Sequence, residues 1–410
     1  MKSNYRAIGE FIQLVDNRNI DLKVSKLVGI TVNKIFIKSV ANTVGTNMYN
    51  YKIIKKNQFA CSLMQVRRDK KIPVSLFKER EAIISQAYPV FEIIDTTKLL
   101  PEYLMMWMSR SEFDREACFY AIGGIRGSLE WEDFCNMKLP IPSIQKQQKI
   151  VDEYNTIVDR IKLNEQLNQK LEEMAQAIYK QWFVDFEFPD SEGKSYKSNG
   201  GKMVYCEELG IEIPEGWDFG CWDDVAIQFS GFAFKGNQYT LDKGISVLRG
   251  ENVTEQRLRW DTHKKWNNSL SGKAKNCFLK EYDIVIGMDG SKIGKNWSIV
   301  SKYQLPLLLA QRVSCVRAKQ FQWQIYLYYS MFINNFAHYV SQVYTGTSIP
   351  HISKEQIMNF PILIPTVDII EIFHKITINI LSYKLINNQE NFKLIKLKQI
   401  LLSKLATIKE

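Results

Sequence analysis

The chain carries the same local pattern twice, and the second copy begins 223 residues after the first. We call this separation the repeat offset. In the first copy, glycines at 123–124 lead through an apolar and acidic stretch into Leu-Pro-Ile-Pro-Ser at 139–143. In the second copy, a glycine at 346 leads through a similar stretch into Ile-Leu-Ile-Pro-Thr at 362–366. A long run with helical periodicity follows each copy. Such a duplication favours a fold with an approximate internal twofold axis. A fold of this kind can recognise a ligand that itself has two halves.

The end of each copy predicts the start of a helix. Pro142 and Pro365, whose separation defines the repeat offset, end an extended segment, and the next residue, Ser143 or Thr366, can cap the first free amides. From there, apolar side chains recur in steps of three and four, which places them on one stripe of a helix. The first run, 143–183, would be about 60 Å long and polar on its other faces, so it must lie along another helix. The second run, 366–410, supplies that partner.

The residues expected to pack these two helices together share the stripe spacing. They are Ile150, Ile157, Ile161, Asn164, Leu171 and Ile178 in the first run, and Phe373, Ile376, Ile380, Asn387, Leu394 and Leu401 in the second. Asn164 and Asn387 are separated by the repeat offset, so they occupy equivalent positions. A polar residue in a helix seam costs stability but can fix the register. The alternative, in which both asparagines face water, remains open.

The remaining segments predict two α+β domains. Residues 1–142 mix short β-rich runs with turns and then a helix that opens at Pro101, a favoured first-turn residue. Residues 184–210 are rich in Gly, Ser and charge, which indicates a flexible linker. Residues 211–365 again have an α+β pattern. At 410 residues the chain exceeds the size at which a single core stops growing, which agrees with two domains.

The composition is basic, with a net charge of +10 and a pI near 9.0, which fits a polyanionic partner such as nucleic acid. A merely basic soluble protein explains the charge equally well. The seven cysteines form no CxxC pair, so we expect reduced thiols in a cytosol. We see no stretch of about 18 apolar residues and no apolar leader at the N-terminus. The sequence therefore predicts a soluble, cytoplasmic protein.

The sequence shows no arrangement of residues typical of catalysis. The four histidines are scattered, and no His/Cys cluster predicts a metal site. The segment 290–296 resembles a phosphate-binding loop but is one residue short and ends in Asn. We therefore expect no catalytic residue, and a chain that guides chemistry done by others. Two alternatives stay open: a self-sufficient DNA-modifying enzyme, either methyltransferase or nuclease, and a coiled-coil adaptor that does not bind DNA.

Cations and amides in loop segments are the candidates for DNA contact. Arg can grip guanine with two hydrogen bonds, whereas Lys mostly neutralises phosphate. The alternative for each residue is an ordinary solvated surface. The candidates are Gln65, Arg67, Arg68, Lys70, Lys71 and Arg126 in the first half, and Lys235, Arg249, Asn252, Lys292, Lys295 and Arg312 in the second.

The whole chain resembles the specificity subunit of type I restriction-modification systems. The resemblance is carried by the duplicated pattern at 139–143, by Ile-Tyr-Lys-Gln-Trp-Phe at 178–183, and by Ile-Pro-Glu-Gly-Trp at 213–217. It implies that 1–142 and 211–365 are target recognition domains, each reading one half of a split double-stranded DNA sequence. It also implies that helices 143–183 and 366–410 pack antiparallel as a coiled-coil spacer. Because the two recognition surfaces differ in sequence, the expected target is not palindromic.

The resemblance also implies partners for the chain. Two methylation subunits bind such a scaffold, and restriction-translocation subunits can join them. Adenine methylation with S-adenosylmethionine is then expected in the partner, and no cofactor in this chain. One departure from the family pattern is the start of the second helix, where Val-Asp-Ile-Ile at 367–370 replaces the Gln-rich first copy at 144–147.

Overall fold

The computed structural model describes residues 5–39, 46–122, 127–261, 263–270, 272–346 and 348–408. The chain divides into two compact units, Met1–Leu163 with Asn391–Glu410, and Asn164–Glu390. The division cuts both long helices, α5 (Ile144–Phe183) and α10 (Val367–Lys404). Each unit therefore contains one globular part and one segment of each long helix. The α+β fold expected from the sequence is confirmed in both units.

The first unit is built on an antiparallel four-stranded sheet in the order β2-β9-β6-β7. Its other strands pair two by two, as β5-β8, β3-β4 and β1-β10. The strands are β1 Tyr5–Ala7, β2 Ile12–Val15, β3 Val28–Ile30, β4 Phe36–Lys38, β5 Lys52–Lys55, β6 Phe59–Cys61, β7 Val74–Leu76, β8 Glu81–Ile84, β9 Val90–Ile93 and β10 Lys138–Pro140. The helices are α1 Val66–Asp69, α2 Pro101–Met108, α3 Ser111–Tyr120 and α4 Trp131–Asn136, and α2 opens at the proline that the sequence analysis singled out.

The second unit contains an antiparallel sheet β14-β22-β19-β20 and a smaller sheet β18-β15-β21, in which β15 and β21 run parallel. The strands are β11 Met203–Cys206, β12 Ile211–Pro214, β13 Asp218–Cys221, β14 Ala226–Ser230, β15 Ile245–Leu248, β16 Val253–Thr254, β17 Arg257–Leu258, β18 Lys265–Trp266, β19 Ile284–Gly287, β20 Trp297–Ile299, β21 Leu307–Leu309, β22 Val313–Ala318 and β23 Pro361–Ile364. The helices are α6 Trp222–Val225, α7 Trp323–Ile333, α8 Phe336–Val343 and α9 Lys354–Met358.

The sequence repeat is also a structural repeat. In each unit a short helix, α4 or α9, leads into a strand, β10 or β23, that pairs antiparallel with an early strand of the same unit, β1 or β13. The long helices begin at Ile144 and Val367, again separated by the repeat offset and directly after the predicted caps. The prolines at the end of each pattern therefore end a paired strand and precede a helix, as the sequence indicated.

The first turn of each long helix is anchored in a different way. The Gln147 side chain is fully buried, accepts a hydrogen bond from the Leu100 amide at 3.0 Å and donates to the carbonyls of Lys98 and Pro142, both at 2.9 Å. At the equivalent place α10 has Ile370, which is fully buried among apolar side chains. The Gln-rich start that the second copy lacks is thus replaced by hydrophobic burial.

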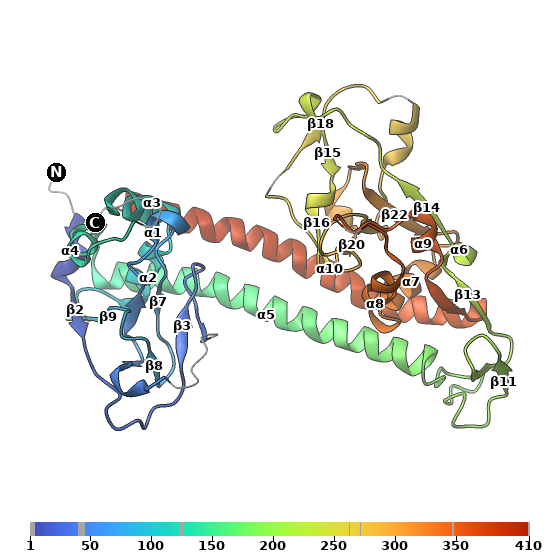
Figure 1. Ribbon diagram of the computed structural model, residues 1–410, viewed down its shortest axis with the longest axis horizontal. Coiled ribbons are helices and arrows are strands. Elements are labelled where there is room, and N and C mark those ends of the chain that lie inside the picture. Colours follow the sequence, from blue (N-terminus) through green and yellow to red (C-terminus); the bar gives the residue numbers. More distant parts are fainter. Residues whose placement is uncertain are drawn as a thin grey trace. The chain divides into compact units, whose positions relative to one another are not determined.

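In the second unit, α5 and α10 run antiparallel, side by side (Figure 1). Phe373 packs against Tyr179, Trp182 and Phe183, with ring centroids 4.9–6.0 Å apart. Earlier on α5 the contacts are polar: the Glu172 carboxylate and the Lys384 ammonium form an ion pair with both side chains largely buried. As residue numbers rise on α5 they fall on α10, which confirms the antiparallel pairing.

Both seam asparagines are buried, so the alternative in which they face water is wrong. Asn164 is 1% exposed and donates to Glu390 at 2.9 Å, while Asn387 donates to the Asn168 carbonyl oxygen at 2.9 Å. Asn168 in turn donates to Asn388 at 2.9 Å. These interhelical hydrogen bonds form only in one register, which is the specificity role that a polar seam residue can have.

Most of the residues predicted to pack the two helices together are at least half-buried, but one of them is exposed. Ile157 and Phe373 are buried, whereas most of the other predicted packing residues are half-buried, namely Ile150, Ile161, Leu171, Ile178, Ile380, Leu394 and Leu401. Ile376 is 41% exposed, so its predicted packing role is wrong; the seam passes through Thr377 and Leu381 instead. An α-helix with 3.6 residues per turn drifts by about 20° per heptad, so a strict three-four count leaves the seam after a few turns.

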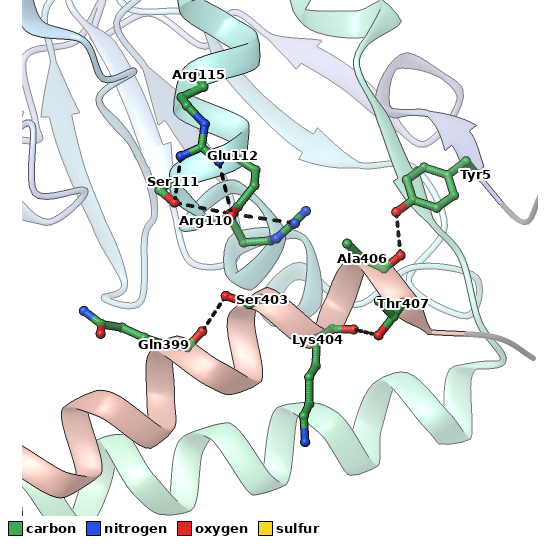
Figure 2. A network of polar contacts seen from close by, with 10 residues as sticks. All are labelled: Tyr5, Arg110, Ser111, Glu112, Arg115, Gln399, Ser403, Lys404, Ala406 and Thr407. Atoms are coloured by element: carbon green, nitrogen blue, oxygen red, sulfur yellow. Dashed lines mark hydrogen bonds and ion pairs between the residues drawn. The ribbon is translucent and has the colours of Figure 1, made fainter.

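The end of α10 is fixed to the first unit near the α2–α3 junction (Figure 2). The Tyr5 hydroxyl donates to the Ala406 carbonyl at 2.9 Å, and Leu402 and Leu405 are buried in the core of that unit. Nearby, the buried Arg110 guanidinium lies 4.1 Å from the Trp107 ring centroid, an arrangement that favours a cation–π contact.

The segment expected to be a flexible linker is folded onto the second unit. Phe186 and Phe188 are buried against Trp217, with ring centroids 5.8 and 5.0 Å away, and Tyr196 stacks on Phe188 at 4.6 Å. Glycines and charges between these aromatic residues gave the segment its linker-like composition. The aromatic side chains nevertheless bury enough apolar area to order it.

Candidate nucleic-acid interface

Each unit has a closed loop immediately before the repeated helix-strand motif. In the first unit, Ile122 and Ser128 exchange two backbone hydrogen bonds, both 3.0 Å long. In the second unit, Thr345 and His351 exchange the same two bonds, at 2.9 and 2.8 Å. Ile122 corresponds to Thr345 and Ser128 to His351, because each pair is separated by the repeat offset. The duplication therefore includes main-chain hydrogen bonds between residues whose identities differ.

A basic segment is bound to the closed loop in each unit. The Arg67 amide donates to the Gly127 carbonyl at 3.3 Å, and the Gly290 amide donates to the Pro350 carbonyl at 3.1 Å. The two acceptors again occupy equivalent positions of the repeat. The basic segment 65–71 of the first unit therefore lies where the glycine-containing loop 290–296 lies in the second.

A second pair of hydrogen bonds supports this equivalence. The Leu129 amide donates to the Leu63 carbonyl at 2.9 Å, and the Ile352 amide donates to the Met288 carbonyl at 3.0 Å. In each unit the chain reaches this point directly after a buried sheet strand, β6 or β19. The amino-acid sequences of 65–71 and 290–296 do not by themselves indicate that the two segments are structurally equivalent.

In the first unit, the short helix α1 and the two residues after it present the predicted cations. Arg67, Arg68, Lys70 and Lys71 are exposed, while Gln65 is half-buried. Gln65 and Lys70 flank the helix with left-handed backbone angles, φ 62° and 52°. Non-glycine residues in this conformation are uncommon and cost free energy, and they concentrate at functional sites.

Arg68 has a partner within its own segment. The Arg68 guanidinium contacts the Asp69 carboxylate at 2.7 Å, and this hydrogen bond holds the pKa of Asp69 below its usual range. The remaining predicted residue of this half, Arg126, lies outside the described residues.

In the second unit, Lys292 and Lys295 are exposed on the equivalent loop. The Lys292 ammonium lies 2.8 Å from the Glu255 carboxylate, and this hydrogen bond lowers the pKa of Glu255. Because both side chains of this pair are more than half exposed, water screens their attraction.

Arg312 is brought to the same loop by a shared carboxylate. Its Nε lies 3.6 Å from Asp289 Oδ2, and the other oxygen, Oδ1, accepts a hydrogen bond from His351 Nδ1 at 2.5 Å. The Arg312 carbonyl also accepts a hydrogen bond from the Met288 amide at 3.1 Å. Arg312 has a left-handed φ of 67° and its side chain is 65% exposed. The sequence analysis named Arg312 but missed Asp289 and His351, whose one signal is that they adjoin the loop glycine and the repeated motif.

Three predicted contact residues lie on other segments of the second unit. Lys235 is exposed beside a short 3-10 helix. Arg249 is half-buried, 2.9 Å from Glu251 and 5.6 Å from the Tyr239 ring centroid.

The third, Asn252, is fully buried, which contradicts its predicted direct contact with DNA. Its side chain accepts from the Arg249 amide at 3.0 Å and donates to the Arg259 carbonyl at 2.9 Å, so it closes a turn. An amide side chain beside a glycine and cations is as well suited to fixing a loop as to reading a base, and sequence alone does not separate these roles.

No metal centre is indicated in the described part of the chain. Among the residues that the structure describes, no three His, Cys, Asp or Glu side chains gather so as to hold a metal ion. Within the same residues, none of the helices combines the length and apolar character that crossing a bilayer requires.

The duplicated architecture matches a known protein family. The family model described as type I restriction modification DNA specificity domain matches twice, at residues 2–173 and 214–391. These two matches cover most of the chain and coincide with the two copies of the structural repeat. The chain belongs to this family of DNA specificity subunits.

Similar proteins agree with this assignment. The HindI specificity subunit of Haemophilus influenzae is 23% identical over 373 residues, which cover 79% of this chain and 80% of that protein. The MjaIX specificity subunit of Methanocaldococcus jannaschii is 24% identical over 324 residues, covering 76% of this chain and 66% of that protein. The crystal structure of the S subunit from M. genitalium has the same fold, with a TM-score of 0.61, 12% identity, and coverage of 99% of this chain and 96% of that one.

The family defines the role of the chain. It is the DNA specificity subunit of a type I restriction-modification system and works as one component of that complex. Specificity subunits are its non-catalytic part; they carry no cofactor, and S-adenosylmethionine is bound by the methylation subunit. The alternative interpretations as a self-sufficient enzyme or as an adaptor without DNA binding are therefore wrong.

Proposed function

We propose that this specificity subunit reads a split, non-palindromic DNA target, with one half-site for each unit. The observation that carries the proposal is the equivalent position of the segments 65–71 and 290–296 against the closed loops. Each half of a two-part ligand would then contact the same backbone arrangement, formed by one of these segments and its closed loop. The side chains on that frame differ, with arginines and lysines in the first unit and lysines, Arg312 and His351 in the second. Different side chains on one frame select different bases.

The charges of these segments divide by role. Exposed Lys70, Lys71, Lys292 and Lys295 suit phosphate neutralisation, which is independent of sequence. Arg312 suits base reading, because the Asp289 carboxylate limits the orientations of its guanidinium before DNA arrives. A fixed arginine loses less conformational entropy on binding, so more of its hydrogen-bond energy remains for discrimination.

The experiment is to map methylated adenines in a genome that expresses this chain with its methylation and restriction subunits. We then replace residues 1–142 with the recognition domain of a relative and map again. One half of the methylated sequence should change, while the other half and the gap stay the same. A change in both halves, or in neither, would refute the assignment of one half-site to each unit.

We also propose that methylation subunits bind an exposed apolar stripe on α10, with restriction subunits joining the assembly in the cytoplasm. Ile372, Ile376, Tyr383 and Ile386 are all exposed and fall within about a quarter of the helix circumference. Exposed Asn379 interrupts this stripe between Ile376 and Tyr383. Apolar side chains gathered on one face of a helix that already has its packing partner on another face are typical of a protein interface. In the same unit, Met174 of α5 is exposed in the same manner.

Tyr383, at 63% exposed, tests this docking surface. Tyr383→Glu should abolish co-purification with methylation subunits while the isolated chain keeps its DNA affinity. The control is Tyr205→Glu, an equally exposed tyrosine on β11. Full assembly of the Tyr383→Glu chain would place the docking surface elsewhere.

A further inference from the structure

The most exposed aromatic side chain near the candidate interface has no packing role in the core. Phe119, in the last turn of α3, is 83% exposed, whereas Phe113 and Ala117 on the same helix are buried in the core of the first unit. Ile122, just beyond the helix, is 70% exposed. Leaving a phenyl group in water forgoes roughly 1.5–3 kcal/mol that burial would supply. This position therefore needs an explanation other than stability.

The phenyl ring is braced by its neighbour. The rings of Phe119 and Tyr120 pack edge to face, with centroids 5.5 Å apart and planes at 75°. Such pairs are favourable by about 0.5–1.5 kcal/mol beyond their buried area. The pair therefore presents a firm aromatic edge at the end of α3, which reduces the entropy lost when the ring enters a partner.

The aromatic edge adjoins the basic segment. The Cys118 thiol, next to Phe119, donates to the Val66 carbonyl in α1 at 3.4 Å, and α1 carries the exposed Arg67 and Arg68. Helices α1 and α3 lie next to each other in the first unit (Figure 1). Ile122 also belongs to the hydrogen-bonded pair that closes the loop. Apolar and cationic side chains thus meet at one place.

This combination fits duplex DNA better than a protein surface. Lysine is depleted in protein interfaces, whereas Lys70 and Lys71 follow α1 here and are exposed. Proteins that bend DNA insert apolar side chains such as Phe, Leu or Ile between base pairs, while cations nearby hold the phosphates. Phe119 and Ile122 supply the apolar side chains, and the α1 cations supply the charge.

The second unit lacks this feature at the same position. Gln342 and Val343, at the end of α8, are the repeat equivalents of Phe119 and Tyr120. An aromatic residue, Tyr344, follows one position later and is less exposed than Phe119. Any distortion that Phe119 causes should therefore be confined to one half of the target.

We propose that Phe119 is a wedge that inserts between adjacent base pairs of the half-site read by the first unit. Tyr120 braces the ring, and Arg67 and Lys70 hold phosphates beside the opened step. The insertion partly unstacks that step and makes its deformability a source of sequence preference. This inference rests on the proposed DNA reading by the first unit.

The test uses the intact complex with methylation subunits and a duplex that carries the mapped target. The fluorescent base 2-aminopurine replaces one base at a time in both half-sites, because its emission rises when it is unstacked. The chain with Phe119 should raise the emission several-fold at one step of the first half-site. Phe119→Ala should abolish that rise and weaken binding by about tenfold, the scale of losing one stacked base. Phe119→Leu should keep part of the rise.

The control is Leu14→Ala on edge strand β2, a similarly large exposed apolar side chain. Strand β2 pairs with β9, and neither strand contains Lys or Arg. It should leave the emission and the affinity unchanged. If the chain binds its target without unstacking any step of the first half-site, the wedge is refuted and the proposed reading stands. If the chain with Phe119 does not bind the target at all, both proposals fail. If Phe119→Ala retains the emission but loses methylation subunits, the wedge is refuted and Phe119 belongs to a protein interface.

Discussion

Removing the lysines of the loop 290–296 should lower the salt dependence of DNA binding by a countable amount. Each phosphate that a lysine neutralises adds about 0.9 to the slope of log affinity against log salt. At roughly 0.15 M salt, one such contact contributes about 1 kcal/mol, or about fivefold in affinity. Lys292→Ala with Lys295→Ala would therefore reduce the slope by at most about 1.8 and the affinity by at most about 30-fold.

The structure refines this estimate for each lysine. Lys295 should show the full fivefold effect. Lys292 already contacts Glu255 at 2.8 Å, and both side chains are more than half exposed. Such an exposed ion pair stabilises the free protein by roughly 0–1 kcal/mol. Lys292 must break this pair to bind a phosphate, so the loss of the pair offsets part of the gain from the phosphate contact. Lys292→Ala should therefore weaken binding by about one- to fivefold, and Glu255→Gln should strengthen it by up to about fivefold.

The assay is fluorescence anisotropy of a labelled target duplex, titrated with the intact complex from low to moderate salt. Because the two lysines are exposed, their removal should change the free energy of unfolding by less than about 0.5 kcal/mol. Lys302→Ala, an exposed lysine outside the candidate interface, is the matched control. An unchanged slope in the double variant, with target binding intact, would refute the placement of this loop against the DNA backbone.

Three further variants test other parts of the structure. Glu172→Gln leaves the buried Lys384 ammonium without its counter-charge and should lower the free energy of unfolding by about 3–5 kcal/mol in denaturant titrations; a loss below about 1 kcal/mol would contradict the buried ion pair. Asn252→Ala should cost about 1–3 kcal/mol in the same measurement but leave the salt slope unchanged, whereas a lower slope would restore its predicted contact with DNA. Asp289→Ala removes the carboxylate that orients Arg312 and should reduce discrimination against single-base mismatches by about 1–3 kcal/mol; equal discrimination would exclude this positioning role.

The helices show how far periodicity reaches. A proline followed by a hydroxyl residue predicted both helix starts, and the structure begins them at Ile144 and Val367. The stripe count placed Ile376 in the seam, but the seam passes through Thr377. Local sequence fixes where a helix begins because caps and prolines act within one turn. It does not fix which side is buried over many turns, because small deviations of helical period accumulate.

The linker and Asn252 show a different limit. Residues 184–210 have the composition of a flexible segment, yet Phe186 and Phe188 bury against Trp217, which lies beyond the end of that segment. Asn252 has the chemistry of a base-reading side chain, yet its hydrogen bonds hold a turn. Composition describes what a side chain can do, and only the neighbours supplied by the fold select one of those roles.

The sequence by itself determined the duplication, the two α+β units, the paired helices and the basic character that identify a split-target reader. These follow from local patterns that recur at one constant offset along the chain. Only the tertiary structure showed that segments 65–71 and 290–296 are equivalent, through the hydrogen bonds of Arg67 to Gly127 and of Gly290 to Pro350. Backbone hydrogen bonds do not depend on side-chain identity, so the same backbone arrangement can persist while the amino-acid sequences of the two segments diverge.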